Sequence, residues 1–310
     1  MNRLEARISL AAITFFAAIQ YAFLARIPGT ISHLAFLCIT DVGGILVTLP
    51  FFLGDLPRLD RRQVAQCVVL AVELMAFNLF LLLGTSGTSP VVASAVLSAW
   101  FVPIAVAAAL SRRTGSRRAS LLGCGVTLLG LFMMMDADAS ALLDRSIAYL
   151  VMADLAFALY IVTAGRWAVS SCPSLLALGQ MSVRAVLALV SWGVEVHVLG
   201  RSSSLPPSVE LWQAVLYTSV FIRGLQSVVQ LYAQRWVGPL ETSLIFSTEI
   251  VMALAVSPVL SRLLGTMPEP ISLSRMVGAV VMVMGILMTE PSFVDGALGG
   301  VLRACGARAR

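Results

Sequence analysis

The chain has 310 residues, of which 59% are hydrophobic and only 12% are charged, and its mean hydropathy is +0.93. Soluble globular domains average roughly 45–50% apolar and about 25% charged residues, because their surfaces need polar side chains. The composition therefore excludes a water-soluble fold and favours an integral membrane protein. All 21 basic residues are arginines, and they form no stripe with interleaved aromatics, so we expect no nucleic-acid partner despite the net charge of +5.

Ten apolar segments have about the length of a membrane-spanning helix, roughly 17–25 residues. Short connections with turn residues separate them, such as GTSGTSP at 84–90 and MPEPIS at 267–272. We interpret the first segment as an uncleaved helix and not a signal peptide, because Phe23 occupies the place where a cleavage site needs a small residue. The sequence thus predicts an all-α integral membrane protein with helices at 8–24, 31–53, 64–83, 91–110, 120–135, 147–165, 174–197, 211–234, 243–264 and 274–289.

The arginines between the helices are distributed unequally over alternate connections. The set that includes the N-terminus holds fourteen of them and the opposite set holds five, while Arg184 and Arg223 fall inside helices. Because cytoplasmic loops carry an excess of Lys and Arg, both termini are predicted to be cytoplasmic, in a cell inner membrane. The segment 291–310 is then a short cytoplasmic tail.

An internal repeat relates the two halves of the chain. The segments 121–134 and 276–289 both contain Gly, six residues and Gly, at a constant offset of 155 positions. The glycines are Gly123, Gly130, Gly278 and Gly285. Pro90 and Pro239 likewise precede or open related helices, 149 positions apart. Five helices in each half is an odd number, so the second repeat (147–289) must enter the membrane from the side opposite to the first (8–135). Inverted repeats of this kind place a solute site near the middle of the membrane, between the halves.

Three stretches resemble the EamA-like branch of the drug/metabolite transporter superfamily. They are ADLAFALYIVTAGRWA (153–168), LYAQRWVGPLETSLIFSTEI (231–250) and the paired glycine helices, and the resemblance covers about residues 8–290. It implies a central cavity lined mainly by helices 1, 3, 4, 6, 8 and 9, with helices 5 and 10 at the periphery. Family members export amino acids, other metabolites or drugs. The chain departs from the family at Ser111-Arg112-Arg113, where a Glu is frequent, and at Ile250, where a Pro is frequent.

Six ionisable side chains fall at membrane depth, where each costs roughly 2.5–3.5 kcal/mol and is usually paired and functional. They are Asp41, Glu73, Asp154, Arg184, Arg223 and Glu249. Asp41 and Arg184 lie in repeat-related helices, and we expect a structural ion pair. Glu73 and Arg223 are also in related helices. They form either a breakable pair that a solute replaces or a static pair between the halves. Four acids against two bases favour a zwitterionic or cationic solute, or proton coupling, over a phosphorylated anion.

Glu249 matches a Glu that recurs in the ninth helix of the family, and Trp100 occupies the equivalent place in the first half. Since a buried carboxyl favours its neutral form, Glu249 is a candidate proton carrier; the alternative is a permanently protonated, hydrogen-bonded side chain. Asp154 resembles it, but is placed near the membrane surface. Other candidates for the cavity wall, each with helix packing as the alternative role, are Gln20, Tyr21, Asn78, Trp100 and Tyr160.

These features predict a secondary active transporter, an exporter of a small metabolite such as an amino acid or another zwitterionic or cationic solute, working by alternating access. A proton or exchange gradient would drive it, since the sequence has no GxxxxGK[ST] motif for ATP. We expect no cofactor, no metal and no enzymatic activity, because HExxH, GxSxG and Cys/His constellations are missing from the sequence. The expected partners are a small-molecule solute and membrane lipids, and a homodimer is compatible. The alternative is a non-transporting membrane component or a lipid scramblase.

Overall fold

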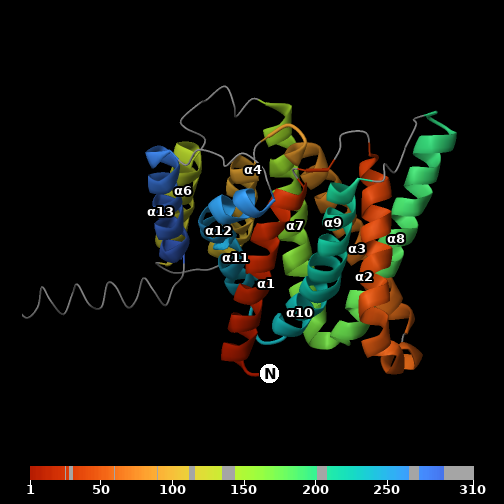
Figure 1. Ribbon diagram of the computed structural model, residues 1–310. Coiled ribbons are helices and arrows are strands. Elements are labelled where there is room, and N and C mark those ends of the chain that lie inside the picture. Colours follow the sequence, from red (N-terminus) through yellow and green to blue (C-terminus); the bar gives the residue numbers. More distant parts are fainter. Residues whose placement is uncertain are drawn as a thin grey trace, which may run out of the picture.

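The computed structural model describes residues 1–24, 26–27, 31–58, 60–88, 90–111, 116–134, 144–200, 208–264 and 272–289 (Figure 1). The predicted tail at 291–310 and the loop arginines Arg112, Arg113 and Arg201 lie outside these ranges. Within them the chain is helical. The helices are α1 (Arg3–Leu24), α2 (His33–Phe52), η1 (Leu53–Arg58), α3 (Arg61–Thr85), α4 (Pro90–Leu97), η2 (Ser98–Trp100), α5 (Phe101–Ser111), α6 (Ser116–Met134), α7 (Arg145–Ser170), α8 (Pro173–His197), α9 (Val209–Tyr217), η4 (Thr218–Gln226), α10 (Ser227–Ala233), α11 (Pro239–Ser247), α12 (Glu249–Leu263) and α13 (Leu273–Thr289).

Helices that follow each other directly form continuous rods, and the described residues contain ten of them. The composite rods are α2–η1, α4–η2–α5, α9–η4–α10 and α11–α12. Each of the ten predicted segments falls on its own rod, so the predicted helix positions are confirmed. Seven rods are long and apolar enough to cross a membrane. Two shorter apolar helical stretches are Leu121–Met134 in α6 and Leu273–Met288 in α13, among the residues that the structure describes. The molecule is therefore an α-helical, multi-pass membrane protein.

Polar residues and prolines set where the helices begin. The Asp60 carboxylate accepts a hydrogen bond from the Gln63 backbone N–H at 2.6 Å and so caps α3. The Ser208 hydroxyl caps α9 in the same way. Pro173 and Pro239 stand in the first turn of α8 and α11, where the missing N–H of proline has no helical partner to lose. These local signals fix the ends of the rods, and the apolar side chains between them fix the packing.

The rods pack as a central bundle with one pair at its edge. Helix α2 packs on α8 and on η4, α3 packs on α7 and α8, and α1 packs on α12, α10 and η4. Helices α6 and α13 lie side by side at one edge of the molecule, and α8 lies at the opposite edge (Figure 1). The peripheral place implied for helices 5 and 10 matches this α6–α13 pair.

Glycines let α6 and α13 approach until their backbones touch. A Cβ added at Gly130 would lie 2.6 Å from the carbonyl oxygen of Gly278, and one added at Gly285 would lie 2.7 Å from that of Gly123. Any larger residue would push the helices apart, so the predicted packing role is confirmed for Gly130, Gly278 and Gly285.

The two ends of the bundle carry separate polar contacts. At the end that holds the N-terminus, Arg3 donates to Glu241 at 2.7 Å, and Arg7 also pairs with Glu241. At the other end, Arg26 donates to Gln213 at 3.2 Å and lies 3.9 Å from Glu210. The apolar rods thus run between two polar layers.

Candidate functional site

A small polar cavity of about 40 Å³ lies in the centre of the bundle. Its walls come from α1, α3, η2, α7, η4 with α10, and α12, which are the rods that the family resemblance implied. Helix α8 is an addition, through Arg184. Since a water needs roughly 10–15 Å³ of such space, the cavity holds about three waters and no metabolite-sized solute. The cavity is thus too small for a metabolite in this structure.

One carboxylate and two guanidinium groups form a buried cluster at the cavity. Asp41 on α2 accepts two hydrogen bonds from Arg184 on α8, one from Nε at 2.7 Å to Oδ2 and one from Nη2 to Oδ1. The Nε of Arg223, on η4, lies 3.3 Å from the same Oδ1. The predicted Asp41–Arg184 ion pair is confirmed, and Arg223 joins it as a second cation. We call these three residues the ion triad.

The predicted pairing of Glu73 with Arg223 is wrong. Glu73 on α3 accepts a hydrogen bond from the Thr163 hydroxyl of α7 at 3.0 Å, and its other oxygen has no hydrogen-bond partner among the described residues. The cavity face of α3 runs from Leu74 to Leu81 in steps of three and four residues. Glu73 lies at the edge of this series, one position before Leu74; it is bonded to α7 and is not among the residues that line the cavity.

Two adjacent glycines of α2 bring η4 close to Asp41. A Cβ at Gly44 would lie 2.5 Å from the Cβ of Arg223, and one at Gly43 would meet the side chain of Ser219 at 2.7 Å. The facing segment η4 is a π-helix, a form that occurs frequently at functional sites. The glycines and the widened helix together place the Arg223 head within 3.3 Å of the Asp41 carboxylate.

Glu249 lies on the cavity wall at a local change of helix geometry. Its side chain is 3% exposed, and the Tyr21 hydroxyl is hydrogen-bonded to its carboxyl group. Just before it, the rod tightens: the Thr248 N–H bonds the Ile245 carbonyl at 3.1 Å, and the Val251 N–H bonds the Thr248 carbonyl at 3.1 Å. Such a step from α to 3-10 bonding often marks a hinge.

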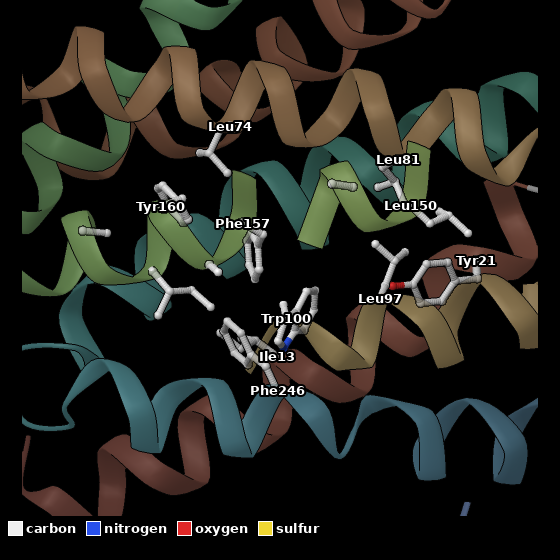
Figure 2. Packing of buried hydrophobic residues seen from close by; sticks show 14 of the residues in the cluster. Ile13, Tyr21, Leu74, Leu81, Leu97, Trp100, Leu150, Phe157, Tyr160 and Phe246 are labelled. Carbon is white, nitrogen blue, oxygen red and sulfur yellow. The ribbon is translucent and has the colours of Figure 1, made fainter. Parts of the chain in front are cut away.

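Trp100 lies 149 positions before Glu249, the same separation as between Pro90 and Pro239. It ends the 3-10 helix η2, so both rods change geometry where these cavity residues stand. Figure 2 shows the Trp100 ring beside Phe157 and Phe246, whose ring centroids are 4.5 Å and 6.1 Å away from it. Its Nε1 is buried and has no hydrogen-bond partner in the described part of the chain. Trp100 therefore presents an aromatic wall with an unused donor.

Two glutamines on the cavity wall were missed by the sequence interpretation. Gln226 Oε1 and Gln230 Nε2 are buried and make no hydrogen bond with the described residues, although both side chains line the cavity. Their signal was the polar series Arg223, Gln226, Ser227 and Gln230, spaced i, i+3, i+4 and i+7 in an otherwise apolar rod. Because unpaired buried amides are unfavourable, these groups are prepared for water or a polar solute.

The remaining candidates divide between the cavity wall and its surroundings. Asn78 and Tyr160 line the cavity; the Asn78 amide donates to the Leu74 carbonyl at 2.6 Å, and Tyr160 accepts from Gln180 at 3.3 Å. Gln20 and Tyr21 also line it. Asp154 is 5% exposed and buried inside the bundle, and it is not among the residues that line the cavity.

The charges on the cavity wall differ from the expected acidic balance. Arg184, Arg223 and Glu249 line it, whereas Glu73 and Asp154 do not. The wall therefore has two bases and one acid, with Asp41 directly behind the bases. The surplus of acids in the membrane segments lies beside the cavity and not on it.

The comparisons with known proteins show a similar fold and no family. No protein-family model matches the sequence, and no curated protein matches it. A solved structure named only "Crystal structure of protein" has a TM-score of 0.65, covering 91% of this chain and 98% of its own, at 16% sequence identity. At this identity the likeness shows a shared fold alone.

Proposed function

We propose that this chain is a secondary active transporter that exports a small metabolite, such as an amino acid or another zwitterionic solute, by alternating access. The observation that carries the proposal is the small central cavity, where the ion triad, Glu249 and unpaired amides converge at the middle of the helices, between rods from both halves. Ionisable side chains inside a membrane bundle mark solute and proton pathways. A cavity of about 40 Å³ is too small for such a solute, so this structure would be a solute-free state of the transport cycle.

The packing pattern supports two inverted repeats, 8–135 and 147–289, of the EamA-like kind. If rods one to five correspond to rods six to ten, each contact between the halves has a counterpart. The α3–α8 contact corresponds to the η4–α2 contact, and the α3–α7 contact corresponds to the α10–α1 contact. Both members of each pair are present. The α6–α13 contact then lies on the axis that relates the halves. We therefore propose ten membrane spans, related in two sets of five by a pseudo-twofold axis, as in the EamA-like transporters.

The arginine distribution supports an inner-membrane location with both termini in the cytoplasm. The bundle end that holds the N-terminus has more arginines than the far end, among them Arg3, Arg7, Arg58, Arg61, Arg62, Arg166 and Arg235. The far end of the described chain has Arg26, Arg145, Arg262 and Arg275. The positive-inside rule places the first end in the cytoplasm.

A flux experiment tests the proposed function. The purified protein is reconstituted into liposomes and offered each of the twenty standard amino acids, radiolabelled, in a counterflow assay. We expect counterflow of at least one of them, and loss of this flux in Asn78→Leu with Gln230→Leu, which removes cavity amides. The control Leu189→Ala changes an exposed side chain of α8 and should transport normally. Absence of flux for every amino acid, with the protein folded, contradicts the proposed substrate class.

One observation favours the alternative of a lipid scramblase. An open groove of about 700 Å³ separates α1 and α11 from α13, and its wall is apolar except near Arg7, Glu241 and Thr248. Such a groove can take a lipid chain. Labelled phospholipid in the same liposomes therefore serves as a second probe. Fast movement of this lipid between the two leaflets without amino-acid flux would favour the scramblase function over the transporter function.

A further inference from the structure

The ion triad carries one positive charge in excess. Asp41 is 0% exposed, Arg184 1% and Arg223 4%, so the three groups are shielded from bulk water. Among the described residues Asp41 is the carboxylate within ion-pair distance of Arg223. A buried charge without a counter-charge is unfavourable, and a second anion beside the triad would neutralise it.

The two arginines share Asp41 unequally. Arg184 engages both carboxylate oxygens through Nε and Nη2, the fork geometry in which arginine binds a carboxylate most strongly. The Nε of Arg223 is 3.3 Å from Oδ1 but makes no hydrogen bond to any described group. Arg223 also lines the cavity beside the unpaired amides of Gln226 and Gln230. An entering anion can therefore take Arg223 while the Asp41–Arg184 pair stays intact.

The side chains of the rest of the cavity wall match a molecule with two charged ends and an apolar part in their chemistry, and the cavity must widen to admit it. Glu249 and its partner Tyr21 come from α12 and α1, and they supply the acidic part of the wall. Phe77, Phe157 and Ile222 supply apolar surface. A carboxylate at Arg223 and an ammonium at Glu249 would leave no surplus charge on either side.

We infer that Arg223 is the binding group for the carboxylate of the solute, and that Asp41 holds Arg223 in place when the cavity is empty. The ligand class is a small α-amino acid or similar zwitterion, with its ammonium group toward Glu249. This inference rests on the proposed transport function and adds to it which side chain recognises which end of the solute.

The test compares three forms of the best-transported amino acid: the acid itself, its carboxamide, and the amine that lacks the carboxyl group. Each competes with the radiolabelled acid in counterflow by wild type, Arg223→Gln and Arg223→Lys. We expect wild type to bind the acid at least tenfold more tightly than the other two forms. Arg223→Gln should bind all three with similar, weak affinity, and Arg223→Lys should recover part of the preference, since Lys keeps the charge but not the fork. Leu189→Ala serves as the matched control.

Each outcome bears on a different statement. A wild type that takes the carboxamide or the amine as well as the acid overturns the inference and leaves the transporter standing. A wild type that transports none of the amino acids overturns the proposed function and the inference with it. If Arg223→Gln does not fold, the wild-type ratio and Arg223→Lys still decide, because a preference that survives unchanged in Arg223→Lys contradicts forked binding by this guanidinium.

Discussion

The Cβ of Arg223 and the Cα of Gly44 are so close that a methyl group added at Gly44 would lie 2.5 Å from the Arg223 Cβ. We therefore expect Gly44→Ala to separate α2 from η4 and to lower the free energy of unfolding by about 1–3 kcal/mol, the usual range for overpacking. Gly193→Ala in α8 is the control, because no atom lies within 4 Å of its added Cβ; it should leave stability unchanged or raise it by up to about 1 kcal/mol. Thermal unfolding in detergent measures both, and equal midpoints would contradict the close packing.

Removing the acid of the ion triad should cost more than removing the second base. Asp41→Asn leaves Arg184 and Arg223 buried without a carboxylate, and breaking a buried pair in this way costs about 3–5 kcal/mol. Arg223→Gln leaves the hydrogen-bonded Asp41–Arg184 pair complete, so we expect a smaller loss of stability. Unfolding midpoints of the two variants give the comparison. Equal losses would contradict this and show that Arg223 contributes as much to the stability of the triad as Asp41 does.

A substitution at the α6–α13 contact should lower the stability of the protein without changing its KM for transport. Gly130→Ala places its Cβ 2.5 Å from the backbone N of Met282 and should lower the unfolding midpoint. Gly125→Ala on the same helix faces open space and should not. Because this contact lies away from the cavity, the KM of the folded fraction should match wild type in both variants. A raised KM in Gly130→Ala alone would connect the peripheral pair to the solute site.

Glu249→Gln tests proton carriage. Glutamine keeps the size and hydrogen-bonding reach of the side chain but cannot bind or release a proton. We expect the variant to exchange solute in counterflow, to lose accumulation driven by a pH gradient, and to show a flat rate against pH. Tyr21→Phe removes only the hydrogen bond to Glu249 and should keep the response to the gradient. Gradient-driven accumulation that survives in Glu249→Gln would exclude this carboxyl as the carrier.

Sequence patterns were sufficient for the helices because a spanning helix depends on length, apolarity and terminal signals. These are local properties, and all ten predicted segments fall on rods. The Asp41–Arg184 pair was also predictable, since two opposite charges at similar depth in packed helices have few other partners. The glycine spacing of 121–134 and 276–289 likewise predicted close contact, because only glycine allows backbones to touch.

The direction of each side chain around its helix was less predictable. Depth alone matched Glu73 with Arg223, but a shift of one residue turns a side chain by about 100°, and Glu73 faces Thr163 instead. The π-helix at Thr218–Gln226 changes the angular positions of the side chains within that rod, and residue propensities do not predict it. Gln226 and Gln230 needed the spacing of the polar series and not the charges alone. The helix positions could thus be predicted from local sequence. The site could not, because it depends on how each helix is rotated about its axis and on which distant segments pack together.

The ion triad also ties the protein to the membrane potential. A single uncompensated positive charge near mid-depth does electrical work when it moves along the membrane normal, about 2.3 kcal/mol for each 100 mV it crosses completely. A carboxylate seated on Arg223 cancels that charge. The transmembrane voltage would then affect the conformational change of the empty bundle more than that of the loaded one. Its main effect would be on the step in which the empty protein returns to its starting conformation.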